Sequence, residues 1–274
     1  MTDTTLDGHG ILVTGGGTGI GAACARALAA SGAAVTICGR TDSKLQATAE
    51  AIDGDIRTVV CDVTDEAQVQ AAVEAAADAP GGLRGVVANA GGGGGMGPYH
   101  LQDTDEFLKV LHLNVLGTML CIKHSVPKMR AAGGGSFIGM SSIAGHQTHR
   151  WFGAYPAAKA GIEQMIRNAA DEYGPANIRF NAIRPGFIAT ELMDGIPRDS
   201  EVYASYIENT PLGDVGEPDD VGALARFLVG PESRWITGQC INIDGGHSLR
   251  RGPQFTQFFA GMGDDVLHGA LPEA

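Results

Sequence analysis

The sequence predicts an α/β fold: a single doubly wound domain whose central parallel sheet of about seven strands carries helices on both faces. Short apolar runs alternate with longer alanine-rich segments along most of the chain, as in repeated strand–helix–strand units. Runs that are continuously apolar rather than alternating indicate strands buried on both faces, as in a parallel sheet. The first run leads into a glycine-rich turn over Gly15–Gly21.

The first half of the chain contains four such runs and three alanine-rich segments. Gly32, Gly54 and Pro80 end the three predicted helices, because glycine favours the position after a helix and proline cannot continue one. The expected strands are Gly10–Thr14, Ala34–Cys38, Ile56–Cys61 and Gly85–Asn89, and the expected helices are Ile20–Ser31, Lys44–Ile52 and Glu66–Ala79.

The second half continues the pattern and then loses it. The expected strands are Ser136–Met140, Ile178–Ile183 and Gln239–Ile243, and the expected helices are Asp105–Arg130, Tyr155–Tyr173 and Asp219–Leu228. No internal repeat or linker divides the chain, so residues 1–246 are expected to form one domain. Residues 247–274 form a tail without clear periodicity. Its apolar side chains predict packing on the body or on a neighbouring subunit; they are Phe255, Phe258, Phe259 and Met262.

Composition and charge exclude several classes of protein. Glycine supplies 41 of 274 residues, about twice the usual share, yet there is no Gly-X-Y period and 44% of residues are hydrophobic, which excludes collagen and simple disorder. A net charge of -12 argues against a nucleic-acid partner and disfavours an anionic membrane surface. Five scattered cysteines, no signal-peptide pattern and no long apolar run predict a soluble cytoplasmic protein.

The turn after the first strand has the features of a dinucleotide-phosphate loop. Glycine permits positive φ and lets the backbone approach a pyrophosphate, while the following helix N-terminus supplies N–H donors and partial positive charge. A tight turn without a ligand is the alternative interpretation. We expect phosphate binding, and the residues expected to contact the cofactor here are Gly15, Gly17, Thr18, Gly19, Ile20 and Gly21.

These glycines, with motifs further along the chain, resemble the short-chain dehydrogenase/reductase family. The spacing of Gly15, Gly19 and Gly21 is similar to its Thr-Gly-x-x-x-Gly-Ile-Gly signature. The resemblance runs from about Leu6 to Gly246 and implies a Rossmann fold that binds NAD or NADP. Other matching motifs are Asp62-Val63, Asn89-Ala90-Gly91, Asn114, Ser141-Ser142, Tyr155 with Lys159, Pro185-Gly186 with Thr190, and Asp244-Gly245-Gly246. The resemblance implies cofactor contacts from Asp62, Val63, Asn89, Ala90, Gly91, Tyr155, Lys159, Pro185, Gly186, Ile188 and Thr190.

The chemistry-bearing residues are Ser142, Tyr155 and Lys159. Tyr155 and Lys159 lie four residues apart on a predicted helix and share a face, so the ammonium is expected to lower the pKa of the phenol toward the working range. Ser142 follows a predicted strand, where its hydroxyl and the phenol could together bind a ketone or alcohol oxygen. Ser141 is expected to bond locally instead. The resemblance assigns Asn114 to a water-linked proton relay from Lys159.

The end of the second strand favours NADP over NAD. A carboxylate at this point usually binds the ribose 2′-hydroxyl of NAD, whereas a nearby arginine accommodates the 2′-phosphate of NADP. Here Gly39 occupies the acidic position and Arg40 follows it. Two observations leave NAD open: Arg40 could stack on adenine or face solvent, and Thr18 stands where NADP enzymes of the family often carry a basic residue.

An apolar substrate of some size is expected. In the family the segment 187–211 forms a lid over the substrate, and here it is rich in large apolar side chains. These are Leu192, Met193, Ile196, Tyr203, Tyr206 and Ile207, with Trp151 and Phe152 near the active-site loop. They suit a steroid-like ring system or an acyl chain in a 3-oxoacyl or 3-hydroxyacyl thioester. Resemblance also implies a homotetramer packed through the helices that begin near Asp105 and Tyr155.

Three other possibilities bear on function. A cofactor-sensing regulatory protein without turnover is the alternative to an enzyme, although it would not need all of Ser142, Tyr155 and Lys159. His146 and His149 are spaced like a metal pair, but no third ligand accompanies them, so we expect no metal. The run Gly91–Gly95 has more glycines than the family motif requires, which predicts a roomy or mobile loop.

Overall fold

The computed structural model describes residues 5–193, 195–252 and 255–263, and its centre is one seven-stranded parallel sheet. The strand order is β3-β2-β1-β4-β5-β6-β7. The strands are β1 Gly10–Thr14, β2 Ala34–Gly39, β3 Ile56–Val60, β4 Leu83–Ala88, β5 Gly135–Met140, β6 Ile178–Pro185 and β7 Cys240–Ile243. The predicted doubly wound α/β fold is confirmed.

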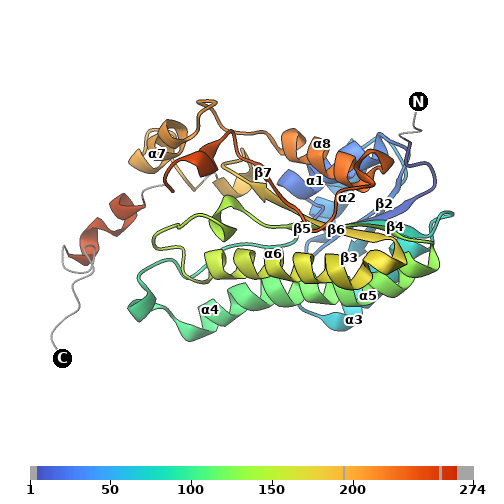
Figure 1. Cartoon of the computed structure of the whole chain (residues 1–274). Helices are drawn as coiled ribbons and strands as arrows, with labels where there is room; N and C mark the ends of the chain where they lie inside the picture. The colour runs from blue at the N-terminus through green and yellow to red at the C-terminus, as the bar shows by residue number, and fades with distance from the viewer. Residues whose placement is uncertain (1–4, 194, 253–254, 264–274) are drawn as a thin grey trace.

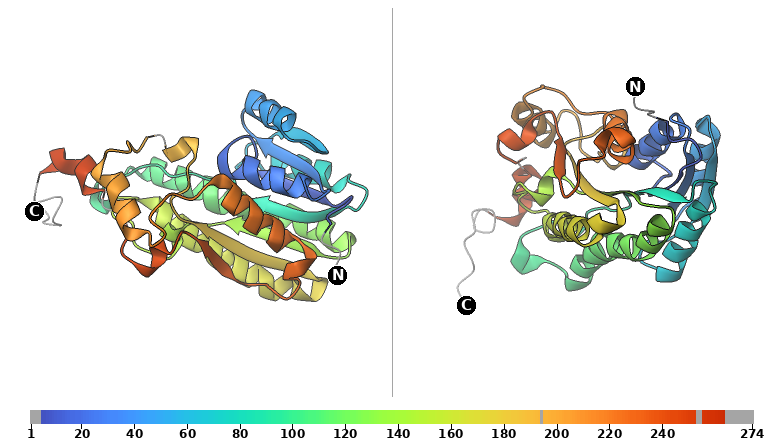
Figure 2. Two further views of the ribbon diagram at one scale, coloured as in Figure 1. Left: turned by 90° about the horizontal axis from the view of Figure 1, so that it is seen from above. Right: turned by 45° about the vertical axis from the view of Figure 1, so that its right-hand side comes forward.

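Helices cover both faces of the sheet and make three layers (Figure 1). On one face α1 packs against α8, and on the other α5 lies between α3 and α6 (Figure 2). The helices are α1 Gly19–Ala29, α2 Asp42–Ala51, α3 Glu66–Ala77, α4 Thr104–Leu111, α5 Gly117–Ala131, α6 Ala154–Tyr173, α7 Glu201–Asn209 and α8 Pro218–Val229. Each face of the sheet has its own cluster of buried apolar side chains, because the strands project apolar side chains to both faces.

Two elements differ from the sequence prediction. The helix expected over Asp105–Arg130 is interrupted by a π-helical turn over His112–Leu116, which divides it into α4 and α5. The lid segment contains the unpredicted helix α7, whose N-cap Ser200 accepts a hydrogen bond from the backbone N–H of Tyr203. The cap residue was the available signal, but the helix is too short for its periodicity to be evident.

The tail packs on the body through one buried aromatic side chain. Phe255 is 2% exposed and contacts Phe187, Val202 and Tyr206, while the ring of Phe259 lies 5.7 Å from that of Trp151. Phe258 and Met262, by contrast, are exposed. Residues 253–254 and 264–274 of the predicted tail lie outside the described residues, as does the side chain of Leu192 in the lid. In the part that is described, no helix combines the length and apolarity that a membrane crossing requires.

Candidate active site

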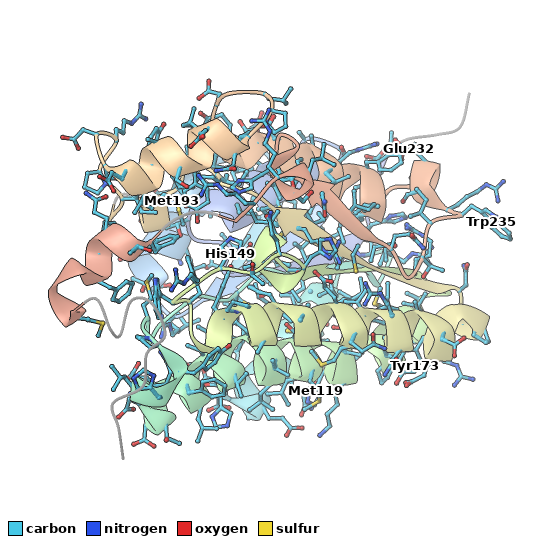
Figure 3. All side chains as sticks on the ribbon, turned by 60° about the vertical axis from the view of Figure 1, so that its left-hand side comes forward. Met119, His149, Tyr173, Met193, Glu232 and Trp235 are labelled. Atoms are coloured by element: carbon cyan, nitrogen blue, oxygen red, sulfur yellow. The ribbon has the colours of Figure 1, made fainter. Side chains whose placement is uncertain are left out.

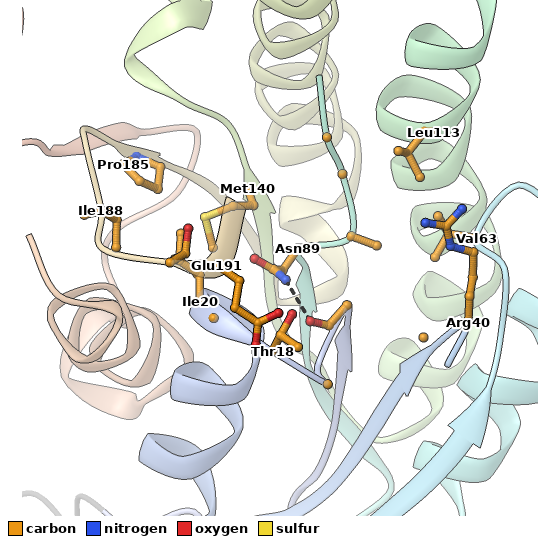
Figure 4. Close-up of a pocket in the computed structure, with 18 of the residues that line it drawn as sticks. Thr18, Ile20, Arg40, Val63, Asn89, Leu113, Met140, Pro185, Ile188 and Glu191 are labelled. Carbon is orange, nitrogen blue, oxygen red and sulfur yellow. Dashed lines mark hydrogen bonds between the residues drawn. The ribbon is translucent and has the colours of Figure 1, made fainter. Parts of the chain in front are cut away.

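A cavity of about 440 Å³ lies at the carboxyl ends of the strands, where the strand order reverses beside β1. This is the place where doubly wound sheets bind ligands. Nearly all of the predicted site residues line it (Figure 4). They are Gly15, Gly17, Thr18, Gly19, Ile20, Arg40, Asp62, Val63, Asn89, Ala90, Gly91, Ser142, Tyr155, Lys159, Pro185, Gly186, Ile188 and Thr190. Gly21 and Asn114 are not among the lining residues.

The glycine loop joins the ends of β1 and β4. Gly15 has φ +65°, and the amide of Asn89 donates hydrogen bonds to the carbonyl oxygens of Thr14 and Gly15 at 3.0 and 3.3 Å (Figure 4). A Cβ on Gly21 would lie only 2.1 Å from the carbonyl oxygen of Gly15. Gly21 is therefore required by the packing of α1 against the loop, rather than by a position in the cavity wall.

One end of the cavity carries the charged groups that follow β2 and β3. Arg40 lies beside Val63, on the side of the cavity away from Pro185 and Ile188 (Figure 4). Hydrogen bonds from the backbone and hydroxyl of Thr64 hold the pKa of Asp62 below its ordinary value, so it is ionised at neutral pH.

An ion pair that the sequence did not predict also borders the cavity. Lys44 of α2 lies 3.0 Å from Glu191, in the segment that follows Thr190, and both residues line the cavity. Because the two are far apart in sequence, no spacing pattern could have paired them. The ion pair joins the start of the lid segment to α2.

At the other end, Tyr155 and Lys159 occupy the first turns of α6. The Lys159 ammonium donates a hydrogen bond to the carbonyl oxygen of Met140 at 2.9 Å and lies 5.3 Å from the centre of the Tyr155 ring. Burial lowers the pKa of Lys159 to about 8. Ser142 follows β5, and its hydroxyl accepts a hydrogen bond from the backbone N–H of Ala144 at 3.2 Å.

The pKa of Tyr155 is raised, contrary to the lowering expected from the sequence. Burial is the main cause and outweighs a hydrogen bond with Ser142, which acts in the opposite direction. The Lys159 ammonium lies over the ring, and burial lowers its own pKa as well. The phenol is therefore protonated at neutral pH.

Asn114 lies behind the cavity wall in the π-helical turn and is fully buried. Its amide nitrogen donates to the carbonyl oxygens of Gly92 and Val110, both at 2.8 Å. A Cβ on Gly91 would lie 2.6 Å from the side-chain oxygen of Asn114 and 3.1 Å from Nζ of Lys159. Asn114 and Lys159 thus approach each other across Gly91, and only glycine fits between them.

The rest of the glycine run is under weaker constraint. Gly95 has φ +59°, which favours glycine. A Cβ on Gly92 would meet Leu113 at 3.7 Å, and one on Gly93 would meet Tyr155 at 3.8 Å, which are ordinary contacts at backbone angles open to other residues. Neither packing nor backbone conformation requires glycine at these two positions. Gly93 leaves the space beside the Tyr155 ring without a side chain, and Gly92 does the same beside Leu113.

A buried ion pair that the sequence did not predict lies behind the catalytic candidates. Glu163 of α6 is 3% exposed and accepts hydrogen bonds from Arg184 at the end of β6 through both of its carboxylate oxygens. The Ser141 hydroxyl donates to the same carboxylate at 2.8 Å and to the carbonyl oxygen of Ser142 at 3.4 Å. The expected local bond is therefore present, but the shorter bond crosses to α6. The available signals were the four-residue step from Lys159 to Glu163 and the position of Arg184 before Pro185.

The loop before α6 is aromatic. The Phe152 ring lies 6.0 Å from that of Tyr155 and 4.7 Å from that of Phe255. His149 is buried, and burial lowers its pKa to about 4; neither it nor His146 is among the cavity-lining residues. Figure 3 shows His149 within the body and Trp235 projecting from one end of the molecule. Within the described residues, no three potential metal ligands are grouped.

Comparison with known proteins identifies the family. The family model described as enoyl-(acyl carrier protein) reductase matches residues 15–248. The cis-4-hydroxycyclohexanecarboxylate dehydrogenase of Sinomonas cyclohexanicum is 36% identical over 239 residues, which are 86% of this chain and 95% of that protein. The 3-alpha-(or 20-beta)-hydroxysteroid dehydrogenase of Mycobacterium bovis is 37% identical over 243 residues, 88% of this chain and 90% of that protein.

A solved structure supports the same assignment. The short-chain type dehydrogenase/reductase from Mycobacterium ulcerans has a TM-score of 0.94 and 42% identity, and the match covers 97% of this chain and 100% of that one. Every residue that lines the cavity lies within residues 15–248, the region that the family model matches. The chain therefore belongs to the short-chain dehydrogenase/reductase family and is an NAD(P)-dependent oxidoreductase acting on small-molecule alcohols or ketones.

Proposed function

We propose that this enzyme interconverts a secondary alcohol and a ketone on an apolar, ring-containing substrate, with NADP as the preferred cofactor. The observation that carries the proposal is the meeting of Ser142, Tyr155 and Lys159 at one end of a cavity whose other end carries the glycine loop and Arg40. The named relatives are dehydrogenases, which favours an enzyme over a cofactor-sensing protein without turnover.

The residues present fit a bound dinucleotide. The positive φ of Gly15 and Gly19 and the N-terminus of α1 form an anion-binding turn, and Gly91 leaves the backbone open beside Lys159. When bound, the cofactor supplies or accepts the hydride. Asp62 and Val63 would hold its adenine end, while Pro185, Gly186, Ile188 and Thr190 would hold its nicotinamide end.

Tyr155 is the general acid and base of the proposed reaction. Its raised pKa keeps the hydroxyl protonated at neutral pH, the form that donates a proton to a carbonyl oxygen during reduction. Ser142 would bind the same oxygen, and Lys159 would stabilise the phenolate that remains. Asn114 fixes the backbone of Gly92, and we keep the water-linked relay from Lys159 as its proposed role. In the oxidative direction the Tyr155 phenolate accepts the proton of the substrate alcohol.

Arg40 supports NADP as the cofactor because a guanidinium matches the geometry of a phosphate monoester. We expect Arg40→Asp to remove the preference for NADP. A carboxylate repels the 2′-phosphate of NADP and accepts a hydrogen bond from the ribose 2′-hydroxyl of NAD. The measurement is kcat/KM with NADPH and with NADH for both proteins. Because the variant loses one charge-assisted contact, we expect kcat/KM with NADPH to fall at least ~10-fold and kcat/KM with NADH to show no comparable fall. Wild-type preference for NADH would refute the assignment.

The space beside Tyr155 supports a substrate with a bulky ring. Gly93 places no side chain there, and the Phe152 ring, 6.0 Å from that of Tyr155, belongs to an aromatic cluster that also includes Phe187. The two named relatives act on cyclic alcohols according to their names. A 3-oxoacyl thioester is the second candidate, because the description of the matching family model, enoyl-(acyl carrier protein) reductase, also names an acyl thioester.

A substrate panel tests the proposed function directly. Oxidation of NADPH would be followed at 340 nm with steroid ketones, substituted cyclohexanones, a 3-oxoacyl thioester and a small acyclic ketone as the reference. We expect the cyclic ketones to give the highest kcat/KM. A preference for the thioester would support the second candidate, and absence of turnover with every compound and both cofactors would contradict the proposed activity.

Two further properties are proposed, the first from the family resemblance and the second from the cysteines. We propose a homotetramer packed through α4, α5 and α6, on which Leu108 and Met119 are exposed apolar side chains. A mass near 28.3 kDa by light scattering would contradict it. We also propose a cytoplasmic location, where the five free cysteines would stay reduced.

A further inference from the structure

We propose that the buried Glu163–Arg184 ion pair is a brace that positions Ser142, Lys159 and the Pro185–Gly186 loop for catalysis. The inference rests on the proposed roles of Ser142, Tyr155 and Lys159. Glu163 and Arg184 are positioning residues, because neither is among the residues that line the cavity. They act through the residues next to them.

Each member of the brace is next to a residue of the site. Tyr155, Lys159 and Glu163 follow one another at four-residue steps on α6 and share one face of the helix. Arg184 directly precedes Pro185 at the end of β6, and Ser141 directly precedes Ser142 at the end of β5. One carboxylate therefore joins the three elements that deliver the proposed catalytic and nicotinamide-side residues.

The contacts leave Glu163 little freedom. Nε and Nη2 of Arg184 donate to different oxygens of Glu163, and the Ser141 hydroxyl donates to one of them. A Cβ on Gly145 would lie 2.8 Å from Oγ of Ser141 and 2.9 Å from Oε1 of Glu163, so the turn after Ser142 packs directly on the brace. A two-pronged contact fixes direction as well as distance.

The brace also reaches the last strand. Nη1 of Arg184 donates to the side-chain oxygen of Asn242 at 3.4 Å, and the amide of Asn242 donates to the Ser248 hydroxyl at 2.7 Å. Burial alone would raise the pKa of Glu163, but hydrogen bonds from Arg184 and Ser141 hold it below its ordinary value. The carboxylate is therefore charged at neutral pH, and the ion pair is intact.

Stability alone does not account for burying two charges at this place. Glu163 and Arg184 are 3% and 9% exposed, and withdrawing such groups from water costs much of what their attraction returns. Apolar side chains of similar volume are often at least as stabilising in such a position. They would not fix β5, α6 and β6 at defined angles, whereas catalytic groups must be held within ~0.5 Å of their productive geometry.

The test separates positioning from folding. Glu163→Gln leaves a buried guanidinium without its counter-charge and is expected to lower the melting temperature by roughly 5–15 °C. The double variant Glu163→Met with Arg184→Met removes both charges and is expected to recover most of that loss. In both we expect kcat to fall at least ~10-fold, while the Kd for NADPH changes less than ~3-fold. The matched control is Glu66→Gln, which breaks an exposed ion pair with Lys123 and should keep wild-type kcat.

The outcomes are distinct. A double variant with recovered melting temperature and wild-type kcat would overturn the brace and leave the ion pair a purely structural feature. If the double variant does not fold, Ser141→Ala provides the test, because it removes the hydrogen bond from the Ser141 hydroxyl to Glu163. A wild-type kcat in that variant would also overturn the proposal. No turnover by the wild type would instead contradict the proposed function itself.

Discussion

Replacing Tyr155 with phenylalanine is expected to lower kcat for ketone reduction at least ~10²-fold, because it removes the only proposed proton donor to the substrate oxygen. The ring stays, so its packing on Phe152 and under Lys159 is kept. The Kd for NADPH should therefore change little. Steady-state kinetics with fluorescence titration of the cofactor would separate the two quantities.

Tyr173→Phe is the matched control for that variant. Tyr173 ends the same helix and packs on Phe180, with ring centres 5.8 Å apart. The Tyr173 variant also loses a phenol hydroxyl, but one that does not line the cavity, so its kcat should equal that of the wild type. Turnover by the Tyr155 variant at the level of this control would remove Tyr155 from the acid–base role.

Lys159→Met is expected to lower kcat by about 10²-fold, because methionine keeps the apolar stem and loses the charge that would stabilise the phenolate. The charge also predicts a pH dependence. Burial places the pKa of Lys159 at about 8, so the wild type carries the ammonium below that pH and loses it as pH rises through the value. We expect kcat/KM for reduction by the wild type to decline above about pH 8. The methionine variant should show no such decline.

Lys128→Met, on α5, is the control, since Lys128 is exposed and lies far from the cavity. It should retain both the rate and the alkaline decline. An identical decline in the Lys159 variant would assign the titration to another group, and a flat wild-type profile up to pH 10 would show that the charge of Lys159 does not control the rate.

The elements that the sequence predicted well are those with local causes. The seven strands follow from short runs rich in apolar and β-branched residues, and the phosphate loop follows from glycines between a strand and a helix. Lys159 could be placed near Tyr155 because four residues make one helical turn. Each of these signals lies within a few adjacent residues.

What the sequence did not show depends on distant residues or on burial. Glu163 meets Ser141 and Arg184 only because three elements converge, and no spacing rule links those positions. The direction of the Tyr155 pKa was wrong because helical spacing shows a nearby ammonium but not how deeply the phenol is buried. The π-helical turn contains Asn114, whose side chain bonds to Val110 on the same helix and to Gly92 in a separate loop, and spacing along the helix could not show the second contact.

β1 lies inside the sheet, between β2 and β4, and this position affects folding of the chain during its synthesis. β1 is the first strand to leave the ribosome, and its partner β2 follows soon after, but its other partner β4 begins only at Leu83. Until then one edge of a strand that is fully buried in the folded protein has open hydrogen-bonding groups, which is a known route to association between chains. While residues 15–82 are being synthesised, the free edge of β1 thus exposes the nascent chain to misassembly.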